Sequence, residues 1–441
     1  MNASIWSETV PKSSEKSNPL LGNITTDVAI IGGGIAGLLT AYFLHQKGIN
    51  YILIEADEVG KGVSANTTAK ITSLHNCNYQ KLIKNFGVTR AKQYLQANEF
   101  AIKQYKKLSE TFPCDFEEKS AYIYSTNNKE KIISEVTALK KLGANAQFVD
   151  KLPLPFPICG AVKLDHQAQF HPLKFMQSIA KNLHIYNHTM AKSIDGCCIK
   201  TDYATIHAKK IVMTTHFPFI NAPGFYFLKM YQERSYVLAL ENAQQVDGMY
   251  LDESKSGYSF RNHGNLLLMG GGSHRTGKQK KEGGFFPLQY AAKQYYPHST
   301  LAYNWATQDC ISLDSIPYIG AYAKKTPNLF VATGFNKWGM TSSMVSAMIL
   351  SDLITGHKNP YSDVFSPKRF HFIASFKNLV YNLYETTIGF LSFQPKRCPH
   401  LGCALNWNKQ ERTWDCPCHG SRFSDKGNLI NNPSIRGFNH E

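Results

Sequence analysis

Four residues near the C-terminus have the types and the spacing of a metal centre. Cys398 and His400 form a Cys-x-His pair, and Cys416 and His419 form a Cys-x-x-His pair after a fifteen-residue spacer. Each pair offers one thiolate and one imidazole, which suits a two-iron cluster whose first iron takes both cysteines and whose second takes both histidines. The main alternative is a Cys₂His₂ zinc site, because zinc uses the same ligand types.

Two further cysteines favour the two-iron cluster, a Rieske centre, over zinc. Cys403 and Cys418 are surplus to ligation and occupy equivalent places in the two loops, so we predict a disulfide that clamps the loops together. Exchanging two thiolates for imidazoles raises the reduction potential into a range of about −150 to +300 mV, where the cluster can accept electrons from a reduced flavin. The other six cysteines are dispersed without ligand spacing, at Cys77, Cys114, Cys159, Cys197, Cys198 and Cys310.

A second chemical motif lies near the N-terminus. Residues 27–31 form a short β-branched apolar run, a glycine-rich turn follows, and residues 38–47 have helical apolar spacing before a second strand at 51–54. This order predicts a complete βαβ unit. Such a unit binds a dinucleotide where the first strand meets the helix.

The glycines of this turn each have a physical role. Gly32 permits the tight turn, Gly34 allows the backbone to approach a pyrophosphate, and Gly37 lets the helix pack closely on the strand. The helix N-terminus offers unpaired N–H groups to the phosphates, and Glu55 can accept hydrogen bonds from the adenosine ribose. An acidic residue at this position argues against NADP, whereas the βαβ unit alone leaves NAD and FAD open.

Later segments favour FAD. Residues 210–214 form a strand that leads into a turn at Thr214, and residues 328–341 form a strand, a glycine-rich turn and a helix start. A helix N-terminus in this place can stabilise negative charge on a reduced flavin ring. No second GxGxxG occurs, so we expect one nucleotide site and no separate NAD(P)H domain.

At this point the chain resembles a known family. Residues 27–370 resemble the D-amino acid oxidase-like (glycine oxidase and sarcosine oxidase) family of FAD-dependent oxidoreductases, and the C-terminus resembles the Rieske domain that some bacterial relatives carry. The stretches that resemble these relatives are Thr67–Thr72, Gln169–Pro172, Gln232–Tyr236, Asp309–Gly320 and Gly334–Thr341.

The resemblance implies site residues along the whole chain. Tyr236, Arg261 and Trp338 are the groups expected near the substrate, although single aromatic and arginine side chains serve packing as often. His75 lies near the expected flavin region, where a lone histidine is more often structural. Contact with FAD is expected at Gly32, Gly34, Ile35, Ala36, Gly37, Glu55, Ala56, Ser64, Thr67, Thr68, Lys70, Thr214, Gly334, Trp338, Gly339, Met340 and Thr341.

These sites need three structural units to position them. We expect an α/β (α+β) FAD-binding Rossmann-like domain, an antiparallel-sheet substrate domain and a small all-β Rieske domain. The expected divisions are an N-terminal extension (1–26), an oxidoreductase (27–370) with FAD-binding segments at about 27–74, 166–224 and 311–356 and a substrate domain at about 75–165 and 225–310, a connecting segment (371–395) and a minimal Rieske domain (396–441).

The Rieske portion departs from its relatives in two ways. Only residues 372–396 precede the first cluster loop, of which 376–384 has a helical pattern, so the domain is expected to borrow packing surface from the flavoprotein. Phe423 stands where high-potential relatives carry a tyrosine, although Ser421 matches their serine. Hydrogen bonds to the sulfurs stabilise the reduced cluster, so we predict a lower potential than in those relatives.

Charge and hydropathy limit the location and the partners. The net charge is +16 and the mean hydropathy is −0.29. The apolar run 340–354 is interrupted by hydroxyl residues and predicts a buried helix, so we expect no transmembrane segment. The N-terminus has no signal-peptide pattern, which favours the cytoplasm. Lys and Arg are scattered without a nucleic-acid motif, so we expect no nucleic-acid partner. The basic charge leaves two kinds of electron acceptor open, an acidic redox protein or a quinone.

Three functions are compatible with these features. The first is a dehydrogenase that oxidises a small amine or amino-acid-like substrate and passes electrons one at a time through the cluster to an external acceptor. The second is an oxidase that reduces oxygen directly and keeps the cluster for structure. The third is a non-catalytic electron carrier or redox sensor, against which a substrate domain of this size argues.

Overall fold

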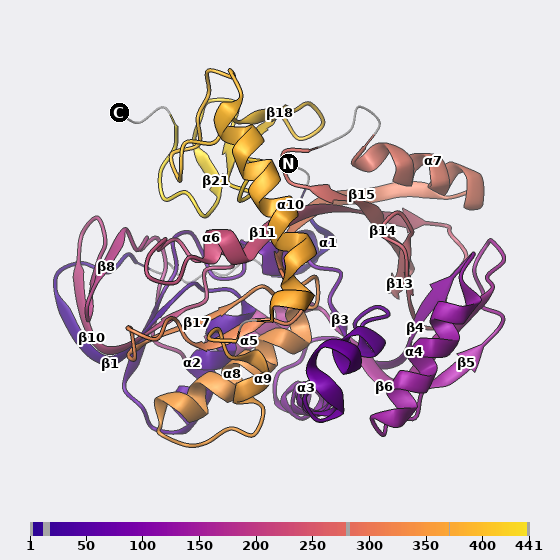
Figure 1. Ribbon diagram of the computed structural model, residues 1–441, viewed down its shortest axis with the longest axis horizontal. Coiled ribbons are helices and arrows are strands. Elements are labelled where there is room, and N and C mark those ends of the chain that lie inside the picture. The colour runs from indigo at the N-terminus through magenta and orange to yellow at the C-terminus, as the bar shows by residue number, and fades with distance from the viewer. Residues whose placement is uncertain (1–2, 12–17, 279–282, 370, 439–441) are drawn as a thin grey trace.

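The computed structural model describes residues 3–11, 18–278, 283–369 and 371–438. Two large sheets lie side by side, and a small C-terminal sheet packs above their junction (Figure 1). The expected fold class is confirmed: an α/β domain, a substrate domain built on a mostly antiparallel sheet, and a small antiparallel domain.

The first sheet has the strand order β16-β17-β10-β1-β2-β7, with the hairpin β8-β9 attached to β10. Its central strands are parallel and buried, as their β-branched sequences predict. Its strands are β1 (Ile24–Ile31), β2 (Tyr51–Ile54), β7 (Ile185–Tyr186), β8 (Ser193–Asp195), β9 (Cys198–Lys200), β10 (Thr205–Met213), β16 (Tyr318–Ala321) and β17 (Leu329–Thr333).

The second sheet has the order β15-β11-β14-β13-β12-β4-β6-β3, with β5 attached to β6. All its pairs are antiparallel except β12 with β4, so the sheet is mixed. Its strands are β3 (Lys70–Ile71), β4 (Glu117–Ser125), β5 (Gln147–Val149), β6 (Gly160–Gln169), β11 (Met230–Glu241), β12 (Met249–Asp252), β13 (Ser259–His263), β14 (Leu266–Arg275) and β15 (Thr300–Ser312).

The helices of these two units cover the sheets and connect them. The buried helix predicted at 340–354 is α8, which packs against α2. A kink at Gly87 (φ 81°) divides the long helix α3. The helices are α1 (Ile5–Thr9), α2 (Ile35–Gln46), the 3₁₀ turn η1 (Val63–Asn66), α3 (Tyr79–Thr111), α4 (Lys129–Lys141), α5 (Pro172–Ala180), α6 (Tyr226–Lys229), α7 (Phe285–Tyr295), α8 (Gly339–Ile354) and α9 (Ser362–Phe365).

The C-terminal unit is a sheet of four short antiparallel strands reached through one long helix. The helix predicted at 376–384 is longer than expected and spans α10 (Phe372–Leu391). The strands are β18 (Asn406–Asn408), β19 (Thr413–Asp415), β20 (Arg422–Ser424) and β21 (Leu429–Asn431). Within the described ranges, no helix combines the length and the apolarity that crossing a membrane requires.

Candidate functional site

The glycine-rich turn after β1 forms a cradle that excludes any side chain. Gly32 has a φ of 111°, and a Cβ atom built on Gly37 would lie 1.9 Å from the carbonyl oxygen of Gly32. Thr214 closes the same turn, because its hydroxyl donates to the carbonyls of Ile31 at 2.9 Å and Gly32 at 3.0 Å. The helix therefore starts directly against β1, with its N-terminal N–H groups available to a phosphate.

Side chains from neighbouring loops hold the cradle in shape. The Glu55 carboxylate accepts from the backbone N–H of Gly33 at 2.6 Å and of Asp57 at 2.9 Å, and the Ser64 hydroxyl accepts from the N–H of Ile35 at 3.1 Å. Burial raises the pKa of Glu55. Glu55 thus orders the turn itself, in addition to the ribose contact that its position predicts.

A cavity of about 1510 Å³ opens from this cradle and runs between the two large sheets. Its volume exceeds that of an ordinary small-molecule pocket, so it can hold a dinucleotide together with a substrate. Gly37, Gly334 and Thr341 are the expected FAD residues that do not line it. Those that do are Gly32, Gly34, Ile35, Ala36, Glu55, Ala56, Ser64, Thr67, Thr68, Lys70, Thr214, Trp338, Gly339 and Met340.

The three residues expected near the substrate occupy different surroundings. Trp338 lines the cavity and stacks on the buried His75 ring, with centroids 4.7 Å apart. Tyr236 also lines the cavity, and its hydroxyl donates to Glu411 at 2.9 Å. Arg261 is fully buried outside the lining, where its guanidinium donates to the carbonyls of Thr68 at 2.7 Å and Ala69 at 3.0 Å. Arg261 therefore shapes the loop at 67–70 rather than facing the cavity.

The N-terminal extension also supports this loop, which the sequence alone did not indicate. The indole of Trp6 in α1 donates to the carbonyl of Thr67 at 2.7 Å, and the hydroxyl of Ser4 donates to the carbonyl of Ala65 at 2.5 Å. Trp6 is fully buried. The extension is thus part of the wall behind the cavity.

Strands β11 and β15 form a wall that contacts both the cavity and the C-terminal unit. Side chains alternate between the two faces of a strand. Arg234 on β11 lies opposite Gln308 on β15, and these residues reach the C-terminal unit through Glu411 and through the carbonyl of Gly420, the latter at 2.8 Å. The next pair, Glu233 and Asp309, lines the cavity. Arg234 and Gln308 line the cavity as well, and so do Arg422 and Asn431 of the C-terminal unit, so the cavity reaches from the glycine cradle to that unit.

The cavity face of this wall carries charges of both signs. Lys337 pairs with Glu233 at 3.0 Å. Burial raises the pKa of Asp309 to about 6, while Lys337 acts in the opposite direction. Lys70 also lines the cavity, and burial lowers the pKa of its ammonium to about 7, with Arg261 adding to the effect. The charged groups at 233, 309 and 337 were not singled out from the sequence, although all three lie in stretches that carry the family resemblance.

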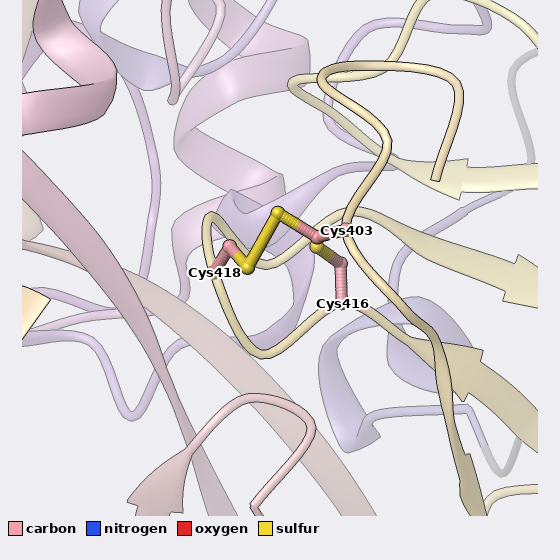
Figure 2. A group of neighbouring side chains, drawn as sticks. All are labelled: Cys403, Cys416 and Cys418. Carbon is pink, nitrogen blue, oxygen red and sulfur yellow. A yellow bond between two sulfur atoms is a disulfide. The ribbon is translucent and has the colours of Figure 1, made fainter. Parts of the chain in front are cut away.

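The two C-terminal loops that carry the predicted metal ligands have matching backbones. The N–H of Cys398 donates to the carbonyl of Cys403 at 2.8 Å, and the N–H of Cys416 donates to the carbonyl of Ser421 at 2.9 Å. The expectation that Cys403 and Cys418 occupy equivalent places is wrong, because the hydrogen bonds align Cys403 with Ser421. The two cysteines nevertheless form a disulfide across the loops, with Cα atoms 6.6 Å apart (Figure 2).

The four predicted ligands approach one another as a thiol pair and an imidazole pair. The thiols of Cys398 and Cys416 are in hydrogen-bond contact, and the rings of His400 and His419 have centroids 5.0 Å apart. The Nδ1 atoms of both rings are buried and have no hydrogen-bond partner among the described residues. Burial lowers the pKa of His400 to about 4 and lowers that of His419 as well, so both rings are neutral, as metal ligands must be.

The spacing of the four predicted ligands fits a two-iron cluster better than a single zinc ion. A tetrahedral zinc ion would hold its ligand atoms about 3.3–3.8 Å apart. Within the described part of the chain, no three of the four predicted ligands have ligand atoms within 4.8 Å of one another. The sulfur of Cys416 lies instead beside the disulfide sulfurs of Cys403 and Cys418, which are not free thiolates (Figure 2).

The outer nitrogens of both imidazoles face the flavin-binding unit. His400 Nε2 donates to the amide oxygen of Asn221 at 2.7 Å, and the His419 ring donates to the carbonyl of Phe227. Such bonds set the tautomer that leaves Nδ1 free for a metal. Asn221 and Phe227 had no signal in the sequence, because neither belongs to a motif.

The C-terminal unit borrows much of its packing from the substrate sheet, as its short lead-in predicts. Arg275 donates to the carbonyls of Pro417 at 2.8 Å and Cys418 at 3.0 Å, and Gln232 donates to the carbonyl of His419 at 2.8 Å. Each of these bonds ends on the second cluster loop. The loop is therefore held by the side chains of β11 and β14.

Comparisons with known proteins agree with this geometry. The family model described as FAD dependent oxidoreductase matches residues 27–353, and the model described as Rieske [2Fe-2S] domain matches residues 382–439. The chain is 35% identical to the protein YhfW of Bacillus subtilis (strain 168) over 469 aligned positions, which cover 93% of this chain and 92% of that one.

Two solved structures illustrate the fold. L-proline dehydrogenase from P. horikoshii superposes with a TM-score of 0.67 at 16% identity, over 78% of this chain and 98% of that one. Glycine oxidase from Geobacillus kaustophilus superposes with a TM-score of 0.66 at 18% identity, over 78% of this chain and 99% of that one. Together with the glycine cradle and the paired cysteine and histidine loops, these matches show that the chain belongs to the FAD dependent oxidoreductase family and carries a C-terminal Rieske [2Fe-2S] domain, with FAD and one [2Fe-2S] cluster as its cofactors.

Proposed function

We propose that the protein is a dehydrogenase that oxidises a small amine or amino-acid-like substrate and sends the electrons through its own Rieske cluster to an external acceptor. The observation that carries the proposal is the shared wall of β11 and β15. Gln308 lines the cavity and also donates to the carbonyl of Gly420, which is adjacent to the ligand His419. The substrate cavity and a cluster loop are thus connected through one side chain.

The cofactors supply complementary chemistry. Bound FAD accepts a hydride from a substrate, whereas a Rieske cluster exchanges single electrons. The chain contributes a fixed distance between the two sites, since the C-terminal unit is held against the sheet by buried hydrogen bonds from Gln232 and Arg275. A fixed arrangement favours transfer within the molecule over transfer between molecules.

The charged cavity face supports an amino-acid-like substrate. Glu233 and Asp309 offer carboxylates to an ammonium group, and Lys337 offers a cation to a carboxylate. A zwitterionic substrate would be oriented by both interactions, which are stronger in a cavity than in water. The fold relatives named for L-proline and glycine support the same substrate class.

Lys70 supports the redox step itself. Its side chain lines the cavity, where it makes no hydrogen bond or ion pair with the described residues. A cation held in this environment stabilises negative charge that develops on a neighbouring group during reaction. We therefore assign Lys70 to stabilising the charge of the reduced flavin.

An anaerobic half-reaction tests the proposal. Purified holoprotein is mixed with a panel of amines and amino acids, and the flavin absorbance and the electron paramagnetic resonance of the reduced cluster are followed together. The proposal expects one substrate to bleach the flavin and to produce the cluster signal. The control is Cys416→Ser, in which the flavin should still bleach without a cluster signal.

Two results would contradict the proposal. If the substrate reduces the flavin while the cluster stays oxidised, and oxygen then reoxidises the flavin rapidly, the protein is an oxidase with a structural cluster. If no candidate substrate reduces the flavin but a chemical reductant does, it is an electron carrier or sensor.

A further inference from the structure

Helix α10, which joins the flavoprotein to the Rieske domain, turns a polar face towards the protein instead of an apolar one. Its inward face is polar: Asn378 donates to the carbonyl of Leu313 at 2.7 Å, Asn382 accepts from Arg275 at 2.8 Å, and Glu385 pairs with Lys278 at 2.7 Å. Asn382 and Glu385 are buried. These contacts set the rotation of the helix, so the opposite face must point away from the protein.

That outward face is apolar. Between Lys377 and Phe393 the helix and the turn after it carry a single charged residue, Glu385, which points inward. In Figure 1 the helix crosses the front of the molecule with no element over it. The large apolar side chains exposed on this face include Val380 (49%), Leu383 (47%), Tyr384 (59%), Ile388 (39%), Phe390 (46%), Leu391 (72%) and Phe393 (100%).

An exposed apolar stripe of this length marks an interaction surface. Soluble proteins rarely leave large contiguous apolar patches in water, because burying apolar surface is favourable. Two further apolar side chains are exposed at α6: Phe225, directly before the helix, and Leu228, within it. Helix α6 packs against α10. The stripe is therefore extended by a second apolar segment from the flavoprotein.

The charges around the stripe indicate what covers it. The exposed Lys377 lies on the helix, and the exposed Arg397 donates to the carbonyls of Gly389 and Phe390 at its C-terminal end. Arg90 contacts His371 at the N-terminal end at 3.2 Å. A second copy would carry the same net charge of +16 over its whole chain and would be repelled, whereas an anionic surface would complement the basic residues.

We propose that the outward face of α10, with the turn to Phe393, binds the surface of a lipid bilayer that contains anionic lipids. An in-plane helix with an apolar face, aromatic side chains and flanking basic residues has the composition of an interfacial membrane anchor. It does not cross the bilayer, in agreement with the length and apolarity of the described helices. The proposal is independent of the substrate and of the direction of electron flow.

This orientation brings the Rieske loops to the membrane surface. A Cβ atom on Gly389 of α10 would lie 2.5 Å from the sulfur of Cys418, so the helix rests directly on the disulfide of the cluster loops. The ring of Phe390 similarly lies beside Gly402 of the first loop. Docking through α10 therefore positions the cluster close to the lipid headgroups.

Vesicle flotation of the full-length holoprotein tests the proposal. The vesicles are phosphatidylcholine with about 30% phosphatidylglycerol, a fraction typical of an anionic leaflet, and pure phosphatidylcholine for comparison. Wild-type protein should float with the anionic vesicles, and raising the salt concentration should weaken this binding because it screens the basic residues. The triple variant Leu383→Gln, Ile388→Gln, Leu391→Gln should partition roughly 100-fold less into the vesicles.

A matched control separates this face from general surface apolarity. Phe286 and Tyr290 on α7 are exposed by 52% and 67%, and the variant Phe286→Gln, Tyr290→Gln should float like the wild type. Flavin absorbance and the cluster resonance signal verify that all variants are folded and loaded. The proposal is overturned if the wild type stays in solution, if the triple variant floats equally well, or if sedimentation shows a dimer that the triple variant dissociates.

Discussion

His400 and Asn221 are separated by 179 positions in the chain, yet His400 Nε2 lies 2.7 Å from the amide oxygen of Asn221. A ligand of the Rieske cluster is thus oriented by a residue of the flavoprotein. The two cofactor units are therefore coupled at the level of single hydrogen bonds, and several consequences can be measured.

Asn221→Ala removes the partner that holds the His400 ring. Losing a hydrogen bond that orients a metal ligand should accelerate cluster loss to a chelator by about tenfold, because such a loss typically costs about 10–100-fold in metal affinity. The decay of cluster absorbance under chelator measures this, and flavin content should not change. Asn359→Ala, which removes a bond of 2.9 Å to Asp352 far from the cluster, should behave like the wild type. Equal decay in both variants would show that the bond to His400 has no such role.

Gly37→Ala should abolish FAD binding. A methyl group at this position would lie 1.9 Å from the backbone carbonyl of Gly32, a clash that no rotamer relieves. Flavin content after purification measures the effect, and the electron paramagnetic resonance signal of the reduced cluster should remain. The control is Gly264→Ala, which strains a turn with φ 55° but meets nothing within 4 Å; it should cost about 1 kcal/mol of stability and retain FAD. A flavin-loaded Gly37→Ala protein would refute the cradle geometry.

Glu411→Gln should weaken the attachment of the Rieske domain to the flavoprotein. The side chain of Glu411 is buried between Arg234 and Arg422, and removing one partner of a buried ion pair costs about 3–5 kcal/mol. Arg422 keeps its pair with Asp415, whereas the buried guanidinium of Arg234 loses its pair with Glu411. Urea unfolding followed through cluster absorbance measures this cost. In contrast, Asp425→Asn removes an exposed pair with Arg412 and should cost less than about 1 kcal/mol.

The Glu411 carboxylate should also make the stability of the protein depend on pH. Burial opposes ionisation of Glu411, but the two guanidinium groups prevail and hold its pKa at about 2, below the ordinary value of 4.5. Because the folded-state pKa is depressed, the stabilisation is fully present above about pH 4.5 and is lost as the pH falls towards 2. Glu411→Gln should flatten the stability profile in this window, and an unchanged profile would assign the acid sensitivity to other groups.

Asp309→Asn should weaken the binding of an amine substrate. Losing one charge-assisted hydrogen bond in the cavity should raise KM by about 10–100-fold. Since burial raises the pKa of Asp309 to about 6, the wild-type KM should also rise as the pH falls below 6, and the variant should lose this dependence. Steady-state kinetics between pH 5 and 8 would measure both effects. Asp247→Asn, an exposed position outside the cavity lining, is the control.

Phe423→Tyr should raise the reduction potential of the cluster. Phe423 is buried among the cysteines of the two loops and packs against Phe438, with ring centroids 5.3 Å apart. A hydroxyl that reaches a cluster sulfur stabilises the reduced state. Redox titration followed by electron paramagnetic resonance measures the potential, and Phe438→Tyr is the control. A potential that does not rise would count against the role of this position.

The sequence by itself determined the parts of the protein whose chemistry depends on local spacing. Gly32, Gly34 and Gly37 predict the dinucleotide cradle because a turn, a close approach and a helix start must follow within six residues. The spacing of Cys398 and His400, and of Cys416 and His419, likewise predicts the ligands of one cluster. Such patterns can be recognised without knowledge of the rest of the fold, since each is complete within one or two short loops.

Only the tertiary structure decided how these parts meet. Asn221, Gln308 and Glu411 belong to no motif and acquire their roles from partners more than a hundred positions away in the chain. Arg261, expected near the substrate, supports a loop instead, because the carbonyls of Thr68 and Ala69 hold its guanidinium outside the cavity lining. The sequence predicted a helix at 376–384, but the contacts of Asn382 and Glu385 determine that the apolar side of α10 faces outward. Long-range pairing of this kind depends on the packing of whole sheets, which no local pattern encodes.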